Sequence, residues 1–210
     1  MSQHIVVGLD EAGVGPAWGS LWAAAVYLPT TIPGLADSKR LSARRRDELR
    51  AQILEVAHHG MGEVSAEEVD TFGLGEARRL VFERALDNFV ANGGPFPSEL
   101  VVDGTLFRPW RGVCHVCIPR ADATVPCVSA ASIMAKTTRD RQVVAMCESI
   151  PELDQQYALR SNKGYLSPAH IAGLRKHGYH TLHRTSYRIR GHSDAIAEAT
   201  KRRLQEEAEQ

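Results

Sequence analysis

Residues 5–16 read Ile5-Val6-Val7-Gly8-Leu9-Asp10-Glu11-Ala12-Gly13-Val14-Gly15-Pro16, an apolar segment followed by two acids and a glycine-rich bend. The β-branched residues that open the segment are typical of a buried strand. The adjacent carboxylates of Asp10 and Glu11 stand at its end. Carboxylates in this position can hold hard cations such as Mg²⁺, and a glycine-rich loop lets a phosphate chain approach main-chain N–H groups. The segment therefore indicates a site for metal and phosphate together.

Other strands and helices alternate along the chain. The order of apolar strand, carboxylate and glycine returns at Leu100-Val101-Val102-Asp103-Gly104, so a second acid stands at a strand end. Apolar residues recur every three or four positions over residues 74–91, which predicts a helix that packs on a sheet. Further strands are expected over residues 4–10, 20–28 and 112–118, and further helices over 43–57, 128–147, 168–177 and 193–208, with a brief helix after Ser65 that ends at Gly73.

The size and charge of the chain limit its class. A chain of 210 residues fits one domain, or one domain with a small appendage, and can bury a substantial core. The formal net charge is zero, which excludes a uniformly basic nucleic-acid binder. Basic residues are clustered instead: residues 38–50 hold six Lys or Arg against two acids, and residues 155–193 hold seven with no Asp or Glu. Two basic patches for a polyanion are therefore expected.

Targeting signals and cysteine pairs are the next features to weigh. No segment has the basic start and apolar core of a secretion signal, and no apolar run approaches the roughly 20 residues that span a bilayer. We therefore expect a soluble cytoplasmic protein without membrane contacts, whose four cysteines are reduced thiols. Cys114 and Cys117 have C-x-x-C spacing, but a strand directs them to opposite faces and no second pair completes a zinc site.

Four acids from three separate segments are candidates for one metal site. They are Asp10, Glu11, Asp103 and Asp122. If folding gathers them, their repulsion raises their pKa values unless divalent cations neutralise the cluster. Two ions about 4 Å apart would activate a water and stabilise the leaving oxygen of a phosphoryl displacement. Taken alone, Asp103 and Asp122 are more typical of turns. Adjacent strand residues point to opposite faces, so Glu11 is expected at the bend or in a role different from that of Asp10.

A dinucleotide site is a competing interpretation of the glycines, because Gly13-x-Gly15-x-x-x-Gly19 follows a strand. Two acids directly ahead of the glycines would repel a pyrophosphate that lacks metal. Pro16 also leads into an expected strand instead of a helix N-terminus. The metal site is therefore the favoured interpretation.

Six blocks of the sequence together resemble a known family, ribonuclease HII, the type 2 ribonuclease H enzymes. The blocks are Gly8-Leu9-Asp10-Glu11-Ala12-Gly13-x-Gly15-Pro16, Asp37-Ser38-Lys39-Arg40-Leu41-Ser42, Val102-Asp103-Gly104, Ala121-Asp122-Ala123 with residues 129–136 and Arg139-Asp140, Lys163-Gly164-Tyr165, and His183-Arg184-x-Ser186-Tyr187. They span residues 5 to about 190 in family order. One departure is Val14, which stands where the family usually has arginine.

The resemblance implies an α/β fold of the ribonuclease H type, a mixed five-stranded sheet flanked by helices, with a small helical C-terminal region. Residues 1–160 would form the catalytic domain, and residues 161–210 would contribute to substrate binding. The implied activity is that of a metal-dependent endoribonuclease, which we expect to be a monomer. An enzyme of this family hydrolyses the phosphodiester 5′ to a ribonucleotide in RNA/DNA hybrids and in duplex DNA with embedded ribonucleotides, leaving 3′-hydroxyl and 5′-phosphate ends. The alternative is a hybrid-binding protein of the same fold with weakened catalysis.

The resemblance also assigns roles residue by residue. It makes the four acids Asp10, Glu11, Asp103 and Asp122 the catalytic residues, which bind two Mg²⁺ or Mn²⁺ ions. The backbone of Gly13-Val14-Gly15 and the ring of Tyr165 are expected at the ribose 2′-OH, the group that distinguishes RNA from DNA. Four basic side chains are expected at phosphates, where they add affinity without sequence preference: Lys39, Arg40, Lys163 and Arg184.

Overall fold

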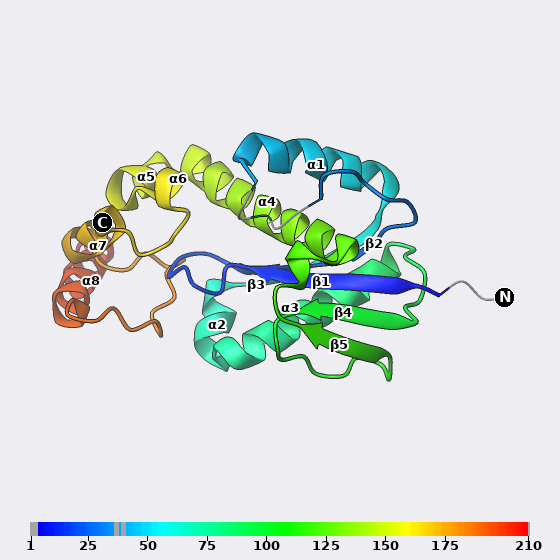
Figure 1. Ribbon diagram of the computed structural model, residues 1–210. Coiled ribbons are helices and arrows are strands. Elements are labelled where there is room, and N and C mark those ends of the chain that lie inside the picture. Colours follow the sequence, from blue (N-terminus) through cyan, green and yellow to red (C-terminus); the bar gives the residue numbers. More distant parts are fainter. Residues whose placement is uncertain (1–3, 36–37, 39–40, 210) are drawn as a thin grey trace.

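The computed structural model describes residues 4–35, 38 and 41–209, and these residues fold around a mixed five-stranded sheet (Figure 1). The strands are β1 (Val6–Ala12), β2 (Leu21–Tyr27), β3 (His58–Val64), β4 (Glu99–Asp103) and β5 (Cys114–Ile118). Their order across the sheet is β3-β2-β1-β4-β5. β1 pairs antiparallel with β2 and parallel with β4, so the expected mixed sheet is confirmed. The glycine bend leads from β1 into β2, a strand, as the metal-site interpretation requires.

Helices cover both faces of the sheet. They are α1 (Ala43–Val56), α2 (Ala66–Phe72), α3 (Leu74–Ala91), α4 (Pro126–Ser149), α5 (Pro151–Tyr157), α6 (Leu159–Asn162), α7 (Pro168–His177) and α8 (Ser193–Ala208). α3 packs on one face, while α1 and α4 cover the other. α5 to α8 gather beyond one end of the sheet, around their own apolar cluster (Figure 1). No helix within the described residues is long and apolar enough to cross a membrane.

The alternation of side chains along β1 fixes which layer each residue meets. Val7 and Leu9 pack into the core beneath α3, whereas Ala12 packs into the core beneath α4. Since successive strand residues point to opposite faces, Asp10 belongs to the α4 side and Glu11 to the α3 side. Both acids lie within the regular strand, and neither is at the bend.

Gly8 is the point where the start of α4 lies directly against β1. A Cβ atom built on Gly8 would lie 2.3 Å from the carbonyl carbon of Cys127 and 2.4 Å from the nitrogen of Val128. Both neighbours are backbone atoms in the first turn of α4, which cannot move away as a flexible side chain could. The absence of a side chain at Gly8 therefore sets the distance between α4 and the strand that carries Asp10.

Replacing Gly8 with alanine is expected to destabilise the protein by at least about 3 kcal/mol, because overpacking against backbone displaces the whole helix. The measurement is the free energy of unfolding in urea. Gly75 offers the matched control, since a Cβ there meets no atom within 4 Å. Gly75→Ala lies in the first turn of α3 and should leave stability unchanged or raise it by up to about 1 kcal/mol. Equal stability of the two variants would contradict the proposed close packing.

Candidate active site

Asp10 and Glu11 leave β1 on opposite faces of the sheet and have different partners. Asp10 is only 6% exposed, and its carboxyl group forms a hydrogen bond with the Ser132 side chain of α4. Its Oδ1 also accepts a hydrogen bond from the backbone nitrogen of Glu11, at 2.7 Å. On the other face, Oε1 of Glu11 lies 2.5 Å from Nη2 of Arg78 on α3. The two neighbouring acids are thus fixed from two different helical layers.

Asp103 and Asp122 come from the adjoining edge of the sheet. Asp103 ends β4, the parallel neighbour of β1, and its Oδ1 accepts a hydrogen bond from the backbone nitrogen of Ala121 at 2.8 Å. Asp122 follows directly, in the single 3₁₀ turn Ala121–Ala123, and is 3% exposed. The hydroxyl of Ser129 donates to the carbonyl oxygen of Asp122 at 2.5 Å and so fastens this turn to α4. The structure therefore links the segments of Asp103 and Asp122 through direct hydrogen bonds.

The electrostatics of Asp10 reflect this crowding. Burial raises the pKa of the Asp10 carboxyl from 3.8 to about 8, and the charges of Glu11 and Asp103 add to the effect, while the hydrogen bonds from Ser132 and the Glu11 backbone oppose it. At neutral pH this carboxyl group therefore keeps its proton unless a cation compensates the negative charge.

The donor chemistry of the four acids fits hard divalent cations, because Mg²⁺ and Mn²⁺ prefer carboxylate oxygens. In the described part of the chain, however, no three His, Cys, Asp or Glu side chains are arranged to hold a metal ion. Two of the acids instead contact protein donors: Glu11 binds Arg78, and Asp103 accepts a hydrogen bond from the backbone of Ala121.

The glycine bend lies beside Tyr165, a residue more than 140 positions later in the chain. Gly13 has a φ of 105°, a conformation that favours glycine, and a Cβ there would lie 2.6 Å from Nε of Arg139. A Cβ on Gly15 would lie 3.5 Å from the Tyr165 ring, which is 46% exposed. The backbone nitrogen of Ala17 donates to the carbonyl of Gly164 at 3.0 Å. The glycine bend, which follows Asp10 and Glu11 in the chain, thus contacts the segment that carries Tyr165.

A family model described as Ribonuclease HII matches residues 7–190 of the chain. The chain belongs to the ribonuclease HII family. Ribonuclease HII of Sphingopyxis alaskensis is 43% identical over 185 residues, which cover 88% of this chain and 89% of the relative. The family resemblance carried by the six sequence blocks is therefore confirmed, and the protein is a ribonuclease H enzyme of type 2.

Solved structures share the fold of this ribonuclease HII chain. The crystal structure of ribonuclease H2 from Pyrococcus horikoshii OT3 superimposes with a TM-score of 0.67 at 23% identity, covering 95% of this chain and 99% of that one. Bst-RNase HIII in complex with Mn²⁺ gives a TM-score of 0.68 at 18% identity, covering 95% of this chain and 71% of that one. These similarities confirm the ribonuclease H type of fold.

The basic residues expected at phosphates occupy different environments. Lys39 and Arg40 lie outside the described residues. Lys163 adopts a left-handed backbone conformation, with a φ of 53°, and its Nζ donates to the carbonyl of Arg160. Val14 packs part of its side chain against the core on the α3 side, and its carbonyl accepts a hydrogen bond from the hydroxyl of Tyr187 at 2.6 Å. In this ribonuclease HII chain, the side chain that replaces the usual arginine is therefore used for packing.

Arg184 has a different position from the one expected. The phosphate contact predicted for it is wrong for this structure, because the residue is 0% exposed. Its Nη1 donates to the carbonyls of Gly13 at 2.6 Å and Pro16 at 3.0 Å, and its Nε donates to the carbonyl of Gly19 at 2.9 Å. Nη1 also lies 3.0 Å from the Tyr187 hydroxyl. Arg184 therefore fixes the glycine bend of this ribonuclease HII fold through hydrogen bonds to its backbone carbonyl groups.

Several residues that support the site were not singled out from the sequence. Besides Ser132 and Arg78, Asp70 of α2 is one of them, since its carboxylate accepts four hydrogen bonds from the backbone and hydroxyl groups of Thr185 and Ser186. Partial burial raises the pKa of Asp70, but these hydrogen bonds outweigh it and lower the pKa overall. No local pattern predicts such partners, because Arg78 lies 67 positions from Glu11 and Thr185 lies 115 positions from Asp70.

Two buried histidines connect the C-terminal segment to Tyr165. The backbone N–H of His180 donates to Nδ1 of His183 at 2.8 Å, so the proton of His183 is assigned to Nε2. That nitrogen donates to Nε2 of His170 at 3.0 Å, and Nδ1 of His170 then donates to the carbonyl of Tyr165, also at 3.0 Å. The chain of hydrogen bonds requires both rings to be neutral. Burial lowers the pKa of each histidine, and for His183 the pKa falls well below 6.5.

The stability of the protein is expected to fall as the pH drops below about 6.5. The unfolded chain takes up protons on His170 and His183 in that range more readily than the native rings do, so His183 contributes a slope approaching about 1.4 kcal/mol per pH unit and His170 adds a slope of the same sign. Urea unfolding between about pH 7 and pH 5 measures this slope. The double variant His170→Asn and His183→Asn should show a smaller slope, and an unchanged slope would contradict the assignment.

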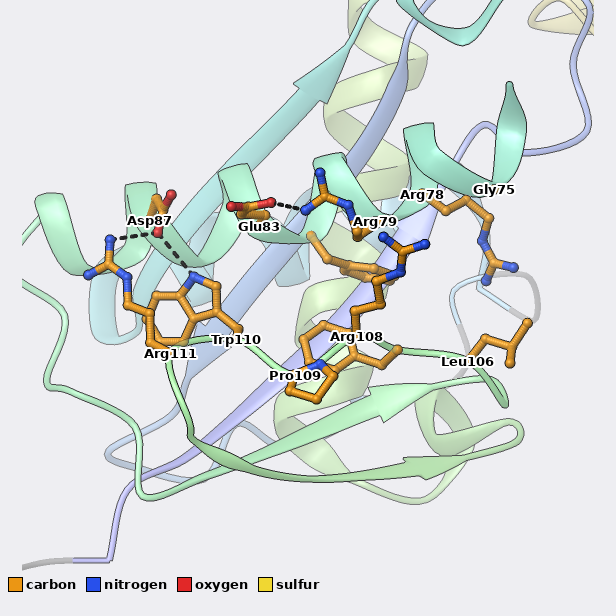
Figure 2. Close-up of a pocket in the computed structure, with 12 residues that line it drawn as sticks. Gly75, Arg78, Arg79, Glu83, Asp87, Leu106, Arg108, Pro109, Trp110 and Arg111 are labelled. Carbon is orange, nitrogen blue, oxygen red and sulfur yellow. Dashed lines mark hydrogen bonds and ion pairs between the residues drawn. The ribbon is translucent and has the colours of Figure 1, made fainter. Parts of the chain in front are cut away.

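A cleft of about 480 Å³ adjoins the acids on the α3 side of the sheet (Figure 2). At one end of it, Arg78 of α3 points toward Leu106 of the β4–β5 connection, whereas Arg79 is turned toward Glu83 on α3 itself. At the other end, the carboxylate of Asp87 binds the indole nitrogen of Trp110 at 3.0 Å and the guanidinium of Arg111 at 2.9 Å. Arginine and aromatic side chains thus line a groove that begins beside Glu11.

Proposed function

We propose that this chain is a metal-dependent endoribonuclease that hydrolyses the phosphodiester 5′ to a ribonucleotide, leaving 3′-hydroxyl and 5′-phosphate ends. Its substrates would be RNA/DNA hybrids and duplex DNA with embedded ribonucleotides. The observation that carries the proposal is Asp10, a buried carboxyl whose pKa is raised to about 8 by burial and by the neighbouring acids Glu11 and Asp103. A carboxyl group held in this way gains most from a bound divalent cation.

Asp10, Glu11, Asp103 and Asp122 would hold two Mg²⁺ or Mn²⁺ ions. Such a pair, when bound, supplies an activated water and neutralises the charge that develops on the leaving oxygen. Ser132 would keep the Asp10 carboxyl oriented from α4, and the 3₁₀ turn would keep Asp122 beside Asp103. Mn²⁺ in the Bst-RNase HIII structure supports a divalent cation in this type of fold.

The glycine bend and Tyr165 would select the ribonucleotide. Backbone groups of Gly13, Val14 and Gly15 are accessible to a ribose because two of the three residues lack side chains. The exposed Tyr165 ring lies against Gly15, where it can meet the sugar of the next nucleotide. We assign Lys39, Arg40 and Lys163 to the phosphates around this position.

The C-terminal region, residues 161–210, would contribute to substrate binding through Tyr165 and through the segment that supports the glycine bend. Residues 1–160 would form the catalytic domain. We propose that the protein acts as a monomer in the cytoplasm. Size-exclusion chromatography with light scattering tests the oligomeric state.

The decisive experiment compares three labelled duplexes: one with a single embedded ribonucleotide, one full RNA/DNA hybrid and one of DNA alone. Cleavage of the first two, dependent on Mg²⁺ or Mn²⁺ and abolished by a chelator, is the expected result, with product ends identified by mass spectrometry. Tight binding of the hybrid without cleavage under any metal would instead support a hybrid-binding protein with weakened catalysis. Equal cleavage of the DNA duplex would contradict selection by the 2′-OH.

A further inference from the structure

The mouth of the cleft, where Glu76 contacts the lining residues Arg79 and Arg108, has the arrangement of an anion site. Glu76 and Arg79 lie in the first two turns of α3, and Arg108 comes from the β4–β5 connection. Nη2 of Arg79 lies 2.7 Å from Oε1 of Glu76, and Nη1 of Arg108 lies 3.4 Å from Oε2. Two guanidinium groups from separate segments therefore converge on the two oxygens of one carboxylate.

The contact of Arg108 is the weaker one. Its side chain is 71% exposed and its distance to Glu76 is long, whereas the side chain of Arg79 is only 30% exposed and also pairs with Glu83. Glu76 is itself 37% exposed. The exposed, long ion pair of Arg108 contributes little stability, so an incoming anion can take the place of Glu76 there at low cost, whereas at Arg79 it must displace the 2.7 Å contact with Glu76.

The mouth of the cleft also lies directly beside the acids. Arg78 lines the cleft and binds Glu11 at 2.5 Å. A Cβ on Gly104, the residue after Asp103, would lie 3.9 Å from Nη2 of the same Arg78. Arg79 and Arg108 therefore line the same cleft as Arg78, the side chain that binds Glu11.

We propose that the mouth of the cleft binds a phosphodiester group of the nucleic acid, at the position where the Glu76 carboxylate now lies. Arginine forks match the paired oxygens of carboxylates and phosphates equally well, so Glu76 acts as an internal substitute for the phosphate. This inference rests on the proposed function, because it extends the same substrate along the same face. It adds a contact outside the glycine bend and outside the four acids.

Two substitutions test the site, and they are expected to change the affinity for an RNA/DNA hybrid in opposite directions. Arg108→Ala should weaken binding of a labelled RNA/DNA hybrid and lower the slope of log Kd against log salt by about 0.9, the value of one phosphate contact. Glu76→Gln removes the competing charge and should tighten the same binding. Fluorescence anisotropy in a chelating buffer, between about 50 and 200 mM salt, gives both quantities without cleavage.

The pair Asp47 and Arg141 provides the matched control. They form a similar exposed ion pair at 2.8 Å, with side chains 53% and 55% exposed, on the α1 and α4 side of the sheet. Arg141→Ala and Asp47→Asn should leave the affinity and the salt slope close to those of the wild type. Thermal melting of all four variants verifies that each is folded.

The outcomes separate the two proposals. A wild type that binds the hybrid while Arg108→Ala and Glu76→Gln match the controls would overturn the phosphate site and leave the proposed function standing. A wild type that neither binds nor cleaves the hybrid would overturn both. Calorimetry with inorganic phosphate distinguishes a site for free phosphate: tight phosphate binding lost in Arg108→Ala, with unchanged hybrid binding, would also overturn the inference.

Discussion

Asp10→Asn is expected to reduce Mg²⁺-dependent cleavage of an RNA/DNA hybrid by at least about 10³-fold, since a metal site contributes several kcal/mol to the transition state. Asp103→Asn should have a comparable effect. Hybrid binding measured in a chelating buffer should persist in both variants, because the glycine bend and Tyr165 are untouched. Asp194→Asn, an exposed acid in α8, is the control and should retain full activity.

The same substitution should raise the stability of the metal-free protein. The pKa of Asp10 is about 8 in the native state against 3.8 in the unfolded chain, so wild-type stability falls as the pH rises from about 4 to 8, while the unfolded state alone loses its proton. Because asparagine cannot ionise, the variant does not lose stability in this way as the pH rises. A higher melting temperature than the wild type at pH 8, together with lost cleavage, is therefore expected. Full retained activity would falsify the assignment of Asp10.

Arg184→Met is expected to destabilise the protein by about 3 kcal/mol or more, because it leaves the carbonyls of Gly13, Pro16 and Gly19 without their donor in a buried position. The glycine bend then loses its fixed geometry. In a chelating buffer, the affinity for a duplex with one ribonucleotide should fall towards the affinity for DNA alone. Urea unfolding and anisotropy measure the two effects.

Two further variants distinguish positioning from charge. Arg190→Met removes an exposed arginine from the same segment and should change neither stability nor the ribonucleotide preference. Arg184→Lys keeps the charge but lacks the planar fork, so it should restore only part of the preference. If Arg184→Met lowered the affinity for both duplexes in parallel and kept their ratio, Arg184 would serve stability alone.

Much of the secondary structure follows from local patterns. The helix expected over residues 74–91 is confirmed as α3, and those expected over 168–177 and 193–208 are confirmed as α7 and α8. Ser65 caps α2 in a complete capping box, as its spacing predicts. These features depend on neighbours within a few positions, which a sequence displays directly.

β3 was not predicted, because it contains features that argue against a strand. Gly60 and Gly62 lie in its centre, and glycine is depleted in strands. The structure explains them by the close approach of α3: a Cβ on Gly60 would lie 2.1 Å from the nitrogen of Phe89, and one on Gly62 would lie 2.1 Å from the carbonyl of Val81. The requirement for glycine comes from residues of α3 that lie between about twenty and thirty positions further along the chain, which no local pattern contains.

In the candidate site, too, some features can be predicted from local sequence and others depend on contacts between distant segments. The acids at the ends of β1 and β4 are visible in the sequence because strand, carboxylate and glycine follow each other in order. The partners of these acids are not visible, since Arg78 reaches Glu11 across the packing of α3 on the sheet. Arg184 was assigned to phosphates for its charge, and only the fold shows that its Nε and Nη1 donate to backbone carbonyls.

The connection of the glycine bend to Gly164 and Arg184 has a consequence for biosynthesis. All four acids have been synthesised once the ribosome has added residue 122. The residues that hold the glycine bend, Gly164 and Arg184, are added only later. A nascent chain therefore contains the four acids before it contains the residues that hold the glycine bend. Truncation before residue 184 should leave the bend without its buried donor, and so without the ribonucleotide preference that we propose for it.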